Sequence, residues 1–215
     1  MEKYRIIYEG GQGEIVEKKS RFIADVAPVH SEAEAAAFIE NIKKKYWDAR
    51  HHCYAFKYGE NQPISRCSDD GEPSGTAGKP ILDVITGEGL YDVCIVVTRY
   101  FGGTLLGTGG LVRAYKDAAK AGIENCMVTE KTAGSKLKIG MDYNYVGKFQ
   151  HFLSTSDANL IGSEYTDKVE FRVVIEREKA DGFSKALVEL TAGKVEILSE
   201  GECYFGTPGG NVVFF

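Results

Sequence analysis

The sequence predicts an α+β protein with two domains. Its 215 residues, 43% of them hydrophobic, are enough for two modest cores, since domains commonly hold roughly 100 to 150 residues. In the first half, the apolar and β-branched run Asp92–Thr98 predicts a buried strand. In the second half, strand and helix patterns follow the order βαββαβ, which fits a ferredoxin-like sandwich. We place the domains at residues 1–131 and 136–205, with a weakly patterned stretch at 129–135 between them.

The first domain is expected to open with strands. Tyr4–Tyr8 is strand-like, and Gly10–Gly13 predicts a turn before strand-like runs around 14–17 and 22–26. A hairpin or meander is the simplest arrangement of these segments.

A helix of about four turns is expected next. Ser31 lies three residues before Glu34, which is a capping-box pattern, and apolar residues follow at the spacing of one helical face. Residues 52–58 then alternate as a strand with one aromatic face. The pattern at Ile81–Ile85 fits a helix or a short strand equally well.

The second domain is expected to contain four strands and two helices. The strands are predicted at Lys136–Met141, Asn159–Tyr165, Val169–Ile175 and Val195–Tyr204, and the helices at Tyr145–Leu153 and Ala180–Leu190.

Composition excludes several classes of protein. The formal net charge of −5 argues against a protein that coats nucleic acid through bulk electrostatics, so a polyanion would have to meet a local patch. The five cysteines contain no C-x-x-C pair, which favours separate reduced thiols. No apolar run approaches the roughly 20 residues of a membrane span, and Met1–Ile6 lacks the core of a signal peptide, so we expect a cytoplasmic protein with no membrane partner.

A glycine-rich loop between the buried strand and a following helix is the first candidate site. Strand, glycine loop and helix are the order that a phosphate cradle requires, because unpaired N–H groups at a helix start favour an anion. Arginines at the two ends could add charge-assisted contacts. The alternative is a turn that needs glycine only for close packing. The candidate anion or nucleic-acid site comprises Arg99, Gly102, Gly103, Gly107, Thr108, Gly109, Gly110 and Arg113, with Lys79 nearby in the sequence.

An acidic loop is the second candidate. Asp69, Asp70 and Glu72 could hold a hard cation such as Mg²⁺, with His51 or His52 joining from the preceding strand. Clustered carboxylates in a Gly/Pro-rich stretch are more often turn formers and caps, so no metal is proposed. Adjacent residues of a strand point to opposite faces, so the two histidines cannot both address one site.

Basic residues are frequent around these loops in the first domain. If the fold gathers even some of them, a positive groove could exist on this acidic protein, although a solvated surface of mixed sign is the alternative. The residues concerned are Lys43, Lys44, Lys45, Arg50, Lys57, Arg66, Lys79, Arg99, Arg113, Lys116 and Lys120.

Three long motifs, at residues 49–56, 68–80 and 97–115, resemble the IMPACT family in the right order, and most closely its bacterial YigZ-type members. The resemblance implies that the first domain has the βα fold of the second domain of ribosomal protein S five. It also implies a second domain similar to the last domain of elongation factor G. Eukaryotic members regulate translation with an additional amino-terminal domain, for which this chain has no room. The family implies no certain catalytic residues.

The favoured hypothesis is a non-enzymatic, translation-associated regulatory protein that binds RNA, the ribosome or another polyanion through the glycine-rich loop. Its second domain would dock on a ribosomal or translation-factor surface. The alternative is a Mg-dependent enzyme acting on a nucleotide or phosphorylated small molecule, with the acidic loop handling Mg²⁺ or protons. A third hypothesis is a protein-interaction scaffold. No cofactor is expected, and the sequence leaves the oligomeric state open.

Overall fold

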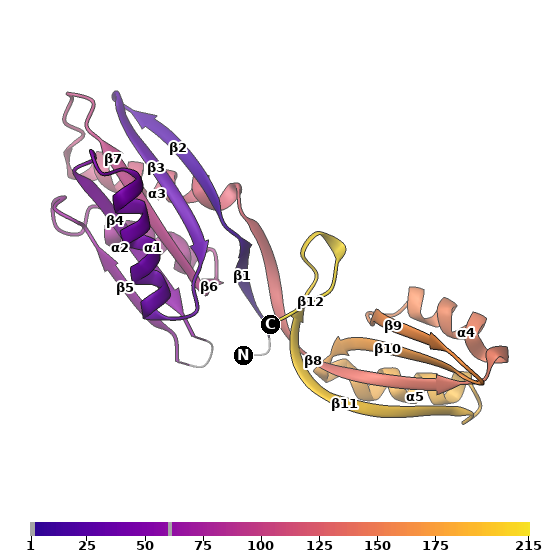
Figure 1. Cartoon of the computed structure of the whole chain (residues 1–215). Helices are drawn as coiled ribbons and strands as arrows, with labels where there is room; N and C mark the ends of the chain where they lie inside the picture. The colour runs from indigo at the N-terminus through magenta and orange to yellow at the C-terminus, as the bar shows by residue number, and fades with distance from the viewer. Residues whose placement is uncertain (1–2, 60–61) are drawn as a thin grey trace. The chain divides into compact units, whose positions relative to one another are not determined.

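The computed structural model describes residues 3–59 and 62–215. Met1 and Glu2, at the start of the segment examined for a signal peptide, lie outside the described residues, as does Glu60 ahead of the polar loop. Contacts divide the chain into an N-terminal unit, Lys3–Glu130, and a C-terminal unit, Lys131–Phe215. Each unit has its own hydrophobic clusters and mixes helices with strands (Figure 1), which confirms the predicted two-domain α+β class.

The N-terminal unit is a five-stranded antiparallel sheet between helical layers (Figure 1). Helix α1 packs on one face, where Ile39 and Ile42 meet Phe56 and Val96. Helices α2 and α3 cover the other. In spatial order the strands are β2 (Gly11–Glu17), β3 (Ser20–Pro28), β7 (Val93–Tyr100), β4 (His51–Tyr58) and β5 (Ile64–Ser68). The helices are α1 (Glu32–Lys45), α2 (Gly78–Gly87) and α3 (Gly107–Glu124), and β1 (Lys3–Glu9) pairs in parallel with β6 (Leu90–Tyr91).

Local signals determine several of these elements. The buried run predicted at Asp92–Thr98 forms the central strand β7, buried from Val93 to Arg99. The Ser31 hydroxyl accepts a hydrogen bond from the Glu34 N–H at 3.2 Å and caps α1, as the capping-box pattern predicts. The ambiguous segment Ile81–Ile85 is helical, within α2.

The turn predicted at Gly10–Gly13 is wrong. Strand β2 starts at Gly11, and a Cβ atom on Gly13 would lie 2.3 Å from the Ala121 carbonyl carbon of α3, so this glycine is needed for helix packing. A tight turn is formed at the next connection, where Lys18 and Lys19 join β2 to β3 with φ angles of 45° and 67°. These positive angles match a two-residue hairpin turn.

The C-terminal unit is an antiparallel sheet with two helices, in the predicted βαββαβ order and with strand order β9-β10-β8-β11 (Figure 1). Its core includes Phe149, Phe171 and Phe183. The strands are β8 (Met127–Met141), β9 (Asn159–Tyr165), β10 (Val169–Glu176), β11 (Val195–Gly206) and β12 (Val213–Phe214), which pairs with the end of β11. The α-helices are α4 (Tyr143–Ser154) and α5 (Ala180–Leu190), and short 3-10 turns occupy Arg177–Lys179 and Pro208–Gly210.

The segment 129–135 was expected to lack regular structure, but it belongs to strand β8. Gly134 was part of the reason for placing a domain boundary there. In the structure a Cβ atom there would lie 2.6 Å from the Phe205 ring, so the glycine admits an aromatic side chain from β11. Within the described residues, no helix has the length and apolar character needed to cross a membrane.

Candidate anion-binding site

The three sequence motifs meet at one end of the N-terminal sheet. Their residues belong to the start of β4, the connection from β5 to α2, and the end of β7 with the loop leading to α3. Arg99 on β7 pairs directly with His51 on β4 and with Phe22 on β3. Residues opposite one another in a sheet share a face, so all three lie on the face covered by α2 and α3.

Arg99 is buried and ion-paired inside the protein. Its Nη1 atom lies 2.6 Å from Glu72 Oε1, and both side chains are less than one-tenth exposed. The rings of Phe22 and Phe101 lie 5.4 and 5.6 Å from the guanidinium carbon. The Arg99 Nε–H has no hydrogen-bond partner among the described residues. Glu72 therefore compensates the charge that the sequence suggested for anion binding.

Tyr115 and Cys53 extend this pair into what we call the buried polar network: Arg99, Glu72, Tyr115 and Cys53. The Tyr115 hydroxyl donates to Glu72 Oε1 at 2.8 Å, and Cys53 Sγ lies 3.3 Å from the hydroxyl oxygen. Burial raises the pKa of both the Tyr115 hydroxyl and the Cys53 thiol. Both groups therefore stay protonated near neutral pH, and Cys53 is not placed to act as a nucleophile.

The acidic loop holds itself and α2 in place. Asp69 accepts hydrogen bonds from the N–H groups of Gly75, Ala77 and Gly78 at 2.8 to 3.0 Å. Burial alone raises the pKa of Asp69, but the three N–H donors outweigh it and leave the pKa lowered. Asp70 Oδ2 accepts from the His52 N–H at 2.6 Å. This geometry matches the turn-and-cap interpretation. In the part of the chain that the structure describes, no three His, Cys, Asp or Glu side chains are grouped as metal ligands.

The two histidines address opposite faces of the sheet, as the strand alternation predicts. His51 Nδ1 lies 2.9 Å from the Asp70 carbonyl oxygen, whereas His52 Nε2 lies 3.0 Å from the Tyr46 carbonyl oxygen beside α1. Only His51 is on the face that carries the network.

The glycines of the loop have different roles. A Cβ atom on Gly102 would lie 2.0 Å from the backbone of Lys19, so this glycine allows the loop to pack on the β2–β3 turn. Gly103 and Gly107 have φ angles of 84° and 73°, which favour glycine. At Gly110 a Cβ atom would lie 3.0 Å from Leu106 Cβ. Packing and conformation therefore account for these four.

Gly109 is different, and it marks the exposed start of α3. Its φ angle is not in the left-handed region. Apart from adjacent residues and the backbone of its own helix, the one described atom within 4 Å of a Cβ atom placed there is Arg113 Nη1, at 3.9 Å. Gly107, Thr108 and Gly109 are exposed, and no side chain caps the helix. The first N–H groups of a helix have no intrahelical acceptor, so this turn presents donors beside the Arg113 guanidinium.

Other cations border the loop. Lys18 and Lys19 are exposed on the turn against which Gly102 packs, at the same end of the unit as the β7–α3 connection (Figure 1). Within residues 3–59 and 62–215, no ion pair or side-chain hydrogen bond is formed by Lys18, Lys19, Arg50 or Arg113. The sequence patterns did not single out the two lysines as part of the site; their position between the strand patterns at 14–17 and 22–26 is the signal that could have identified them.

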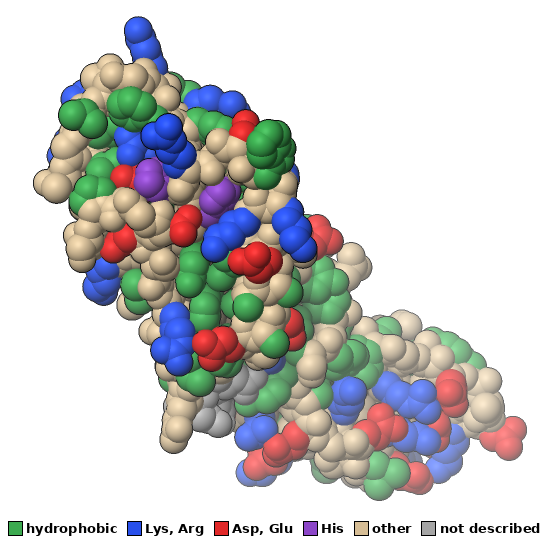
Figure 2. Space-filling view, turned by 60° about the vertical axis from the view of Figure 1, so that its left-hand side comes forward, with side chains coloured by type: hydrophobic (Ala, Val, Ile, Leu, Met, Phe, Trp, Pro, Cys, Tyr) green, Lys and Arg blue, Asp and Glu red, His purple; other side chains and the backbone are tan. Residues whose placement is uncertain are grey.

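Arg50 lines a cleft of about 380 Å³ beside the loop. Two of the lining side chains are exposed and apolar: Leu105 is 82% exposed and Phe101 is 56% exposed. Trp47, which precedes the lining residue Asp48 in the chain, is also 82% exposed. Figure 2 shows histidine, Lys and Arg side chains together with hydrophobic ones on a face of this unit. The cleft is lined by Asp48, Ala49, Arg50, His51, Arg99, Tyr100, Phe101 and Leu105.

Lys79, one of the predicted site residues, contributes less than the sequence suggested. Lys79 lies on α2 and its Nζ atom is 2.6 Å from Asp83 Oδ1, so its charge is already paired. Tyr100 donates its hydroxyl proton to Asp48 Oδ1 at 2.7 Å, which ties the end of β7 to the segment after α1. Burial and Asp48 raise the pKa of Tyr100 to about 12, so this bond persists at neutral pH.

Fold and site define a two-domain α+β protein with cations gathered around an open helix start. The Impact N-terminal domain matches residues 18–123, and a domain of unknown function, DUF1949, matches residues 139–194. The chain is 43% identical to the IMPACT family member YvyE of Bacillus subtilis, covering 94% of this chain and 93% of that protein. It is 36% identical to YigZ of Escherichia coli, covering 85% and 90%. This chain belongs to the IMPACT family, as the resemblance predicted.

Among solved structures, the chain is similar to one described as the crystal structure of a hypothetical protein. The sequences are 35% identical, the TM-score is 0.58, and the match covers 94% of this chain and 98% of the other. The likeness therefore extends over both domains.

Proposed function

We propose that the chain is a non-enzymatic, translation-associated regulatory protein that binds RNA through the glycine-rich loop, the start of α3 and the adjoining cleft. The observation that carries the proposal is the set of exposed cations around the loop that form no ion pair with any described residue: Lys18, Lys19, Arg50 and Arg113. The role in translation is what the resemblance of the three motifs to the IMPACT family implies.

Ion pairing separates these cations from several other exposed cations on the same unit. Arg21 lies 2.9 Å from Glu14, Arg66 lies 3.1 Å from Glu32, and Lys79 lies 2.6 Å from Asp83. A cation that already has a carboxylate partner must give up that interaction to bind phosphate, a small cost at an exposed site, whereas an unpaired cation has no such cost. The unpaired group therefore supports a local polyanion site on a chain whose net charge is −5.

The apolar rim favours a nucleic acid over a purely ionic ligand. Phe101, Leu105 and Trp47 are exposed beside or near Arg50. Nucleobases stack on aromatic side chains while neighbouring cations contact the phosphates, a combination that single-stranded nucleic acids use. The acidic loop supports the enzyme alternative less well, because Asp69 caps α2 and Glu72 pairs with Arg99.

The test is binding of a fluorescently labelled single-stranded RNA to the full chain, measured by anisotropy over a range of salt concentrations. Arg113→Gln removes one unpaired cation, so affinity should fall and the slope of log K against log salt should become shallower by about 0.7 to 1. Arg66→Gln is the matched control, because it removes an exposed arginine that is already paired. No binding, or equal loss in both variants, would refute the proposal.

A further inference from the structure

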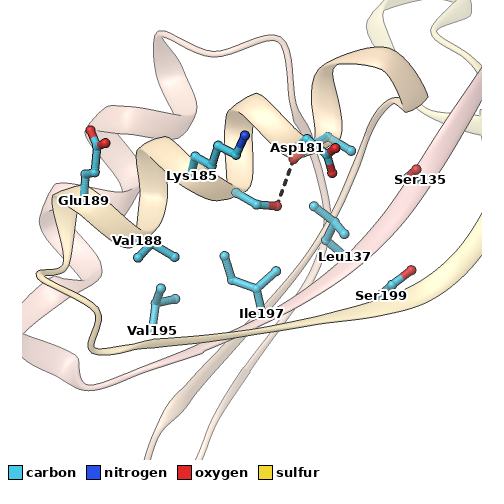
Figure 3. Close-up of a pocket in the computed structure, with 11 residues that line it drawn as sticks. Ser135, Leu137, Asp181, Lys185, Val188, Glu189, Val195, Ile197 and Ser199 are labelled. Atoms are coloured by element: carbon cyan, nitrogen blue, oxygen red, sulfur yellow. Dashed lines mark hydrogen bonds between the residues drawn. The ribbon is translucent and has the colours of Figure 1, made fainter.

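The C-terminal unit contains a groove that the proposed RNA site does not use. Its volume is about 730 Å³, and it lies between α5 and the strands β8 and β11 (Figure 3). Leu137, Val195 and Ile197 form an apolar floor, and Val188 on α5, 41% exposed, faces them. Apolar side chains thus converge on a cavity that is open beside β11.

Strand β11 also has an edge along this side of the groove that pairs with no strand over most of its described length. Strand β11 pairs with β8 on one side from Val195 to Phe205. On its other side, among the described residues, β12 pairs only with Phe205 and Gly206. An irregularity between Ser199 and Gly201 ends the regular register, so Val195–Ser199 is a regular free edge. Such an edge presents N–H and C=O groups to any chain that extends the sheet.

The acidic residues on this edge of β11 indicate the charge of the segment that could bind there. Many natural proteins protect an edge strand with lysine or proline, but β11 has neither and carries three glutamates. The groove wall adds Asp181 and Glu189 around a single Lys185. The glutamates pair with basic residues of neighbouring segments, so a basic ligand must displace these residues. The cost is small because the glutamates remain partly exposed and exposed ion pairs are weak. These pairs are Glu196 with Lys168, Glu200 with Arg172 and Glu202 with Arg177.

We propose that the outer edge of β11 binds an extended basic peptide segment of a partner protein as an additional strand. Side chains of a strand alternate between faces, so every second residue of the segment enters the groove over Val195 and Ile197. The residues between them lie on the other face, where lysine or arginine meets Glu196 and Glu200. A second copy of β11 fits less well, because antiparallel pairing sets glutamates against glutamates.

The probe is a fluorescently labelled peptide of alternating lysine and valine, about eight residues long, the length of an ordinary strand. We expect saturable binding to the full chain, measured by anisotropy. Val188→Asn should weaken it by about tenfold through loss of an apolar contact in the groove, whereas Val16→Asn, at an exposed valine of the N-terminal unit, should have no effect. A peptide of alternating glutamate and valine should not bind.

Backbone pairing has its own control. The lysine–valine peptide with N-methyl groups on alternate residues keeps its charge and side chains but cannot form the inter-strand bonds, so it should bind at least about tenfold more weakly. Hydrogen–deuterium exchange of the segment Val195–Ser199 should slow when the unmethylated peptide binds. Equal affinity of the methylated peptide, unchanged exchange at this edge, or a dimer of the chain that competes with the peptide would overturn the proposal.

Discussion

Replacing Glu72 by glutamine tests whether the buried polar network holds the three motifs together. The substitution keeps the shape of the side chain but leaves the charge of Arg99 uncompensated. The Arg99 side chain is less than one-tenth exposed, and its Nε–H already lacks a hydrogen-bond partner among the described residues. Removing one partner of a buried ion pair costs roughly 3 to 5 kcal/mol. The amide oxygen can still accept one hydrogen bond, so we expect the lower end, about 3 kcal/mol.

The measurement is urea unfolding of the full chain. Trp47 is the single tryptophan and lies in the N-terminal unit, so its fluorescence reports on the unit that contains the network. A double variant, Glu72→Met with Arg99→Met, should be less destabilised than the sum of its two single variants by about 1 to 3 kcal/mol, because no buried charge is left alone. A Glu72→Gln variant within about 0.5 kcal/mol of the parent would refute this reasoning.

Three further predictions follow from the same contacts. Asp69→Ala should destabilise the N-terminal unit by about 2 kcal/mol at pH 7. The pKa of Asp69 is lowered in the folded state, so the stability difference between parent and variant should be fully present above pH of about 4. Urea unfolding at a series of pH values should show this difference disappear as the pH falls through the folded-state pKa of Asp69. Gly109→Ala should raise the unfolding midpoint, by up to about 1 kcal/mol in stability, while weakening RNA binding in the anisotropy assay; unchanged binding would exclude a backbone contact there. Gly102→Ala should lower the thermal unfolding midpoint, because its Cβ atom would overlap the Lys19 backbone, and a midpoint equal to that of the parent would contradict this packing role.

Much of the fold could be predicted because its signals are local. A run of buried β-branched residues predicts β7, and Ser31 with Glu34 predicts the start of α1. Predictions from glycine were less reliable, since glycine also serves close packing. Gly13 lies against α3 and Gly134 against Phe205, and neither contact is visible in a local pattern.

The candidate site likewise has features that local sequence patterns predict and features that only long-range contacts create. Alternation along a strand was enough to separate His51 from His52. The partner of Arg99 could not be read from the sequence, because Glu72 lies 27 positions away and reaches it only when the connection from β5 to α2 folds over the sheet. Lys18 and Lys19 join the site for a similar reason, through packing of their turn on Gly102.

The sequence by itself determined the two-domain class, the family and the region of the chain in which a site should be sought, because periodicity and long motifs are properties of neighbouring residues. Only the tertiary structure decided which charges are available for binding. Arg99 and Arg113 look alike in the sequence, yet one is buried against Glu72 and the other is exposed beside an open helix start. Whether a charge is compensated depends on which groups folding brings within a few ångströms of it, and those groups come from distant parts of the chain.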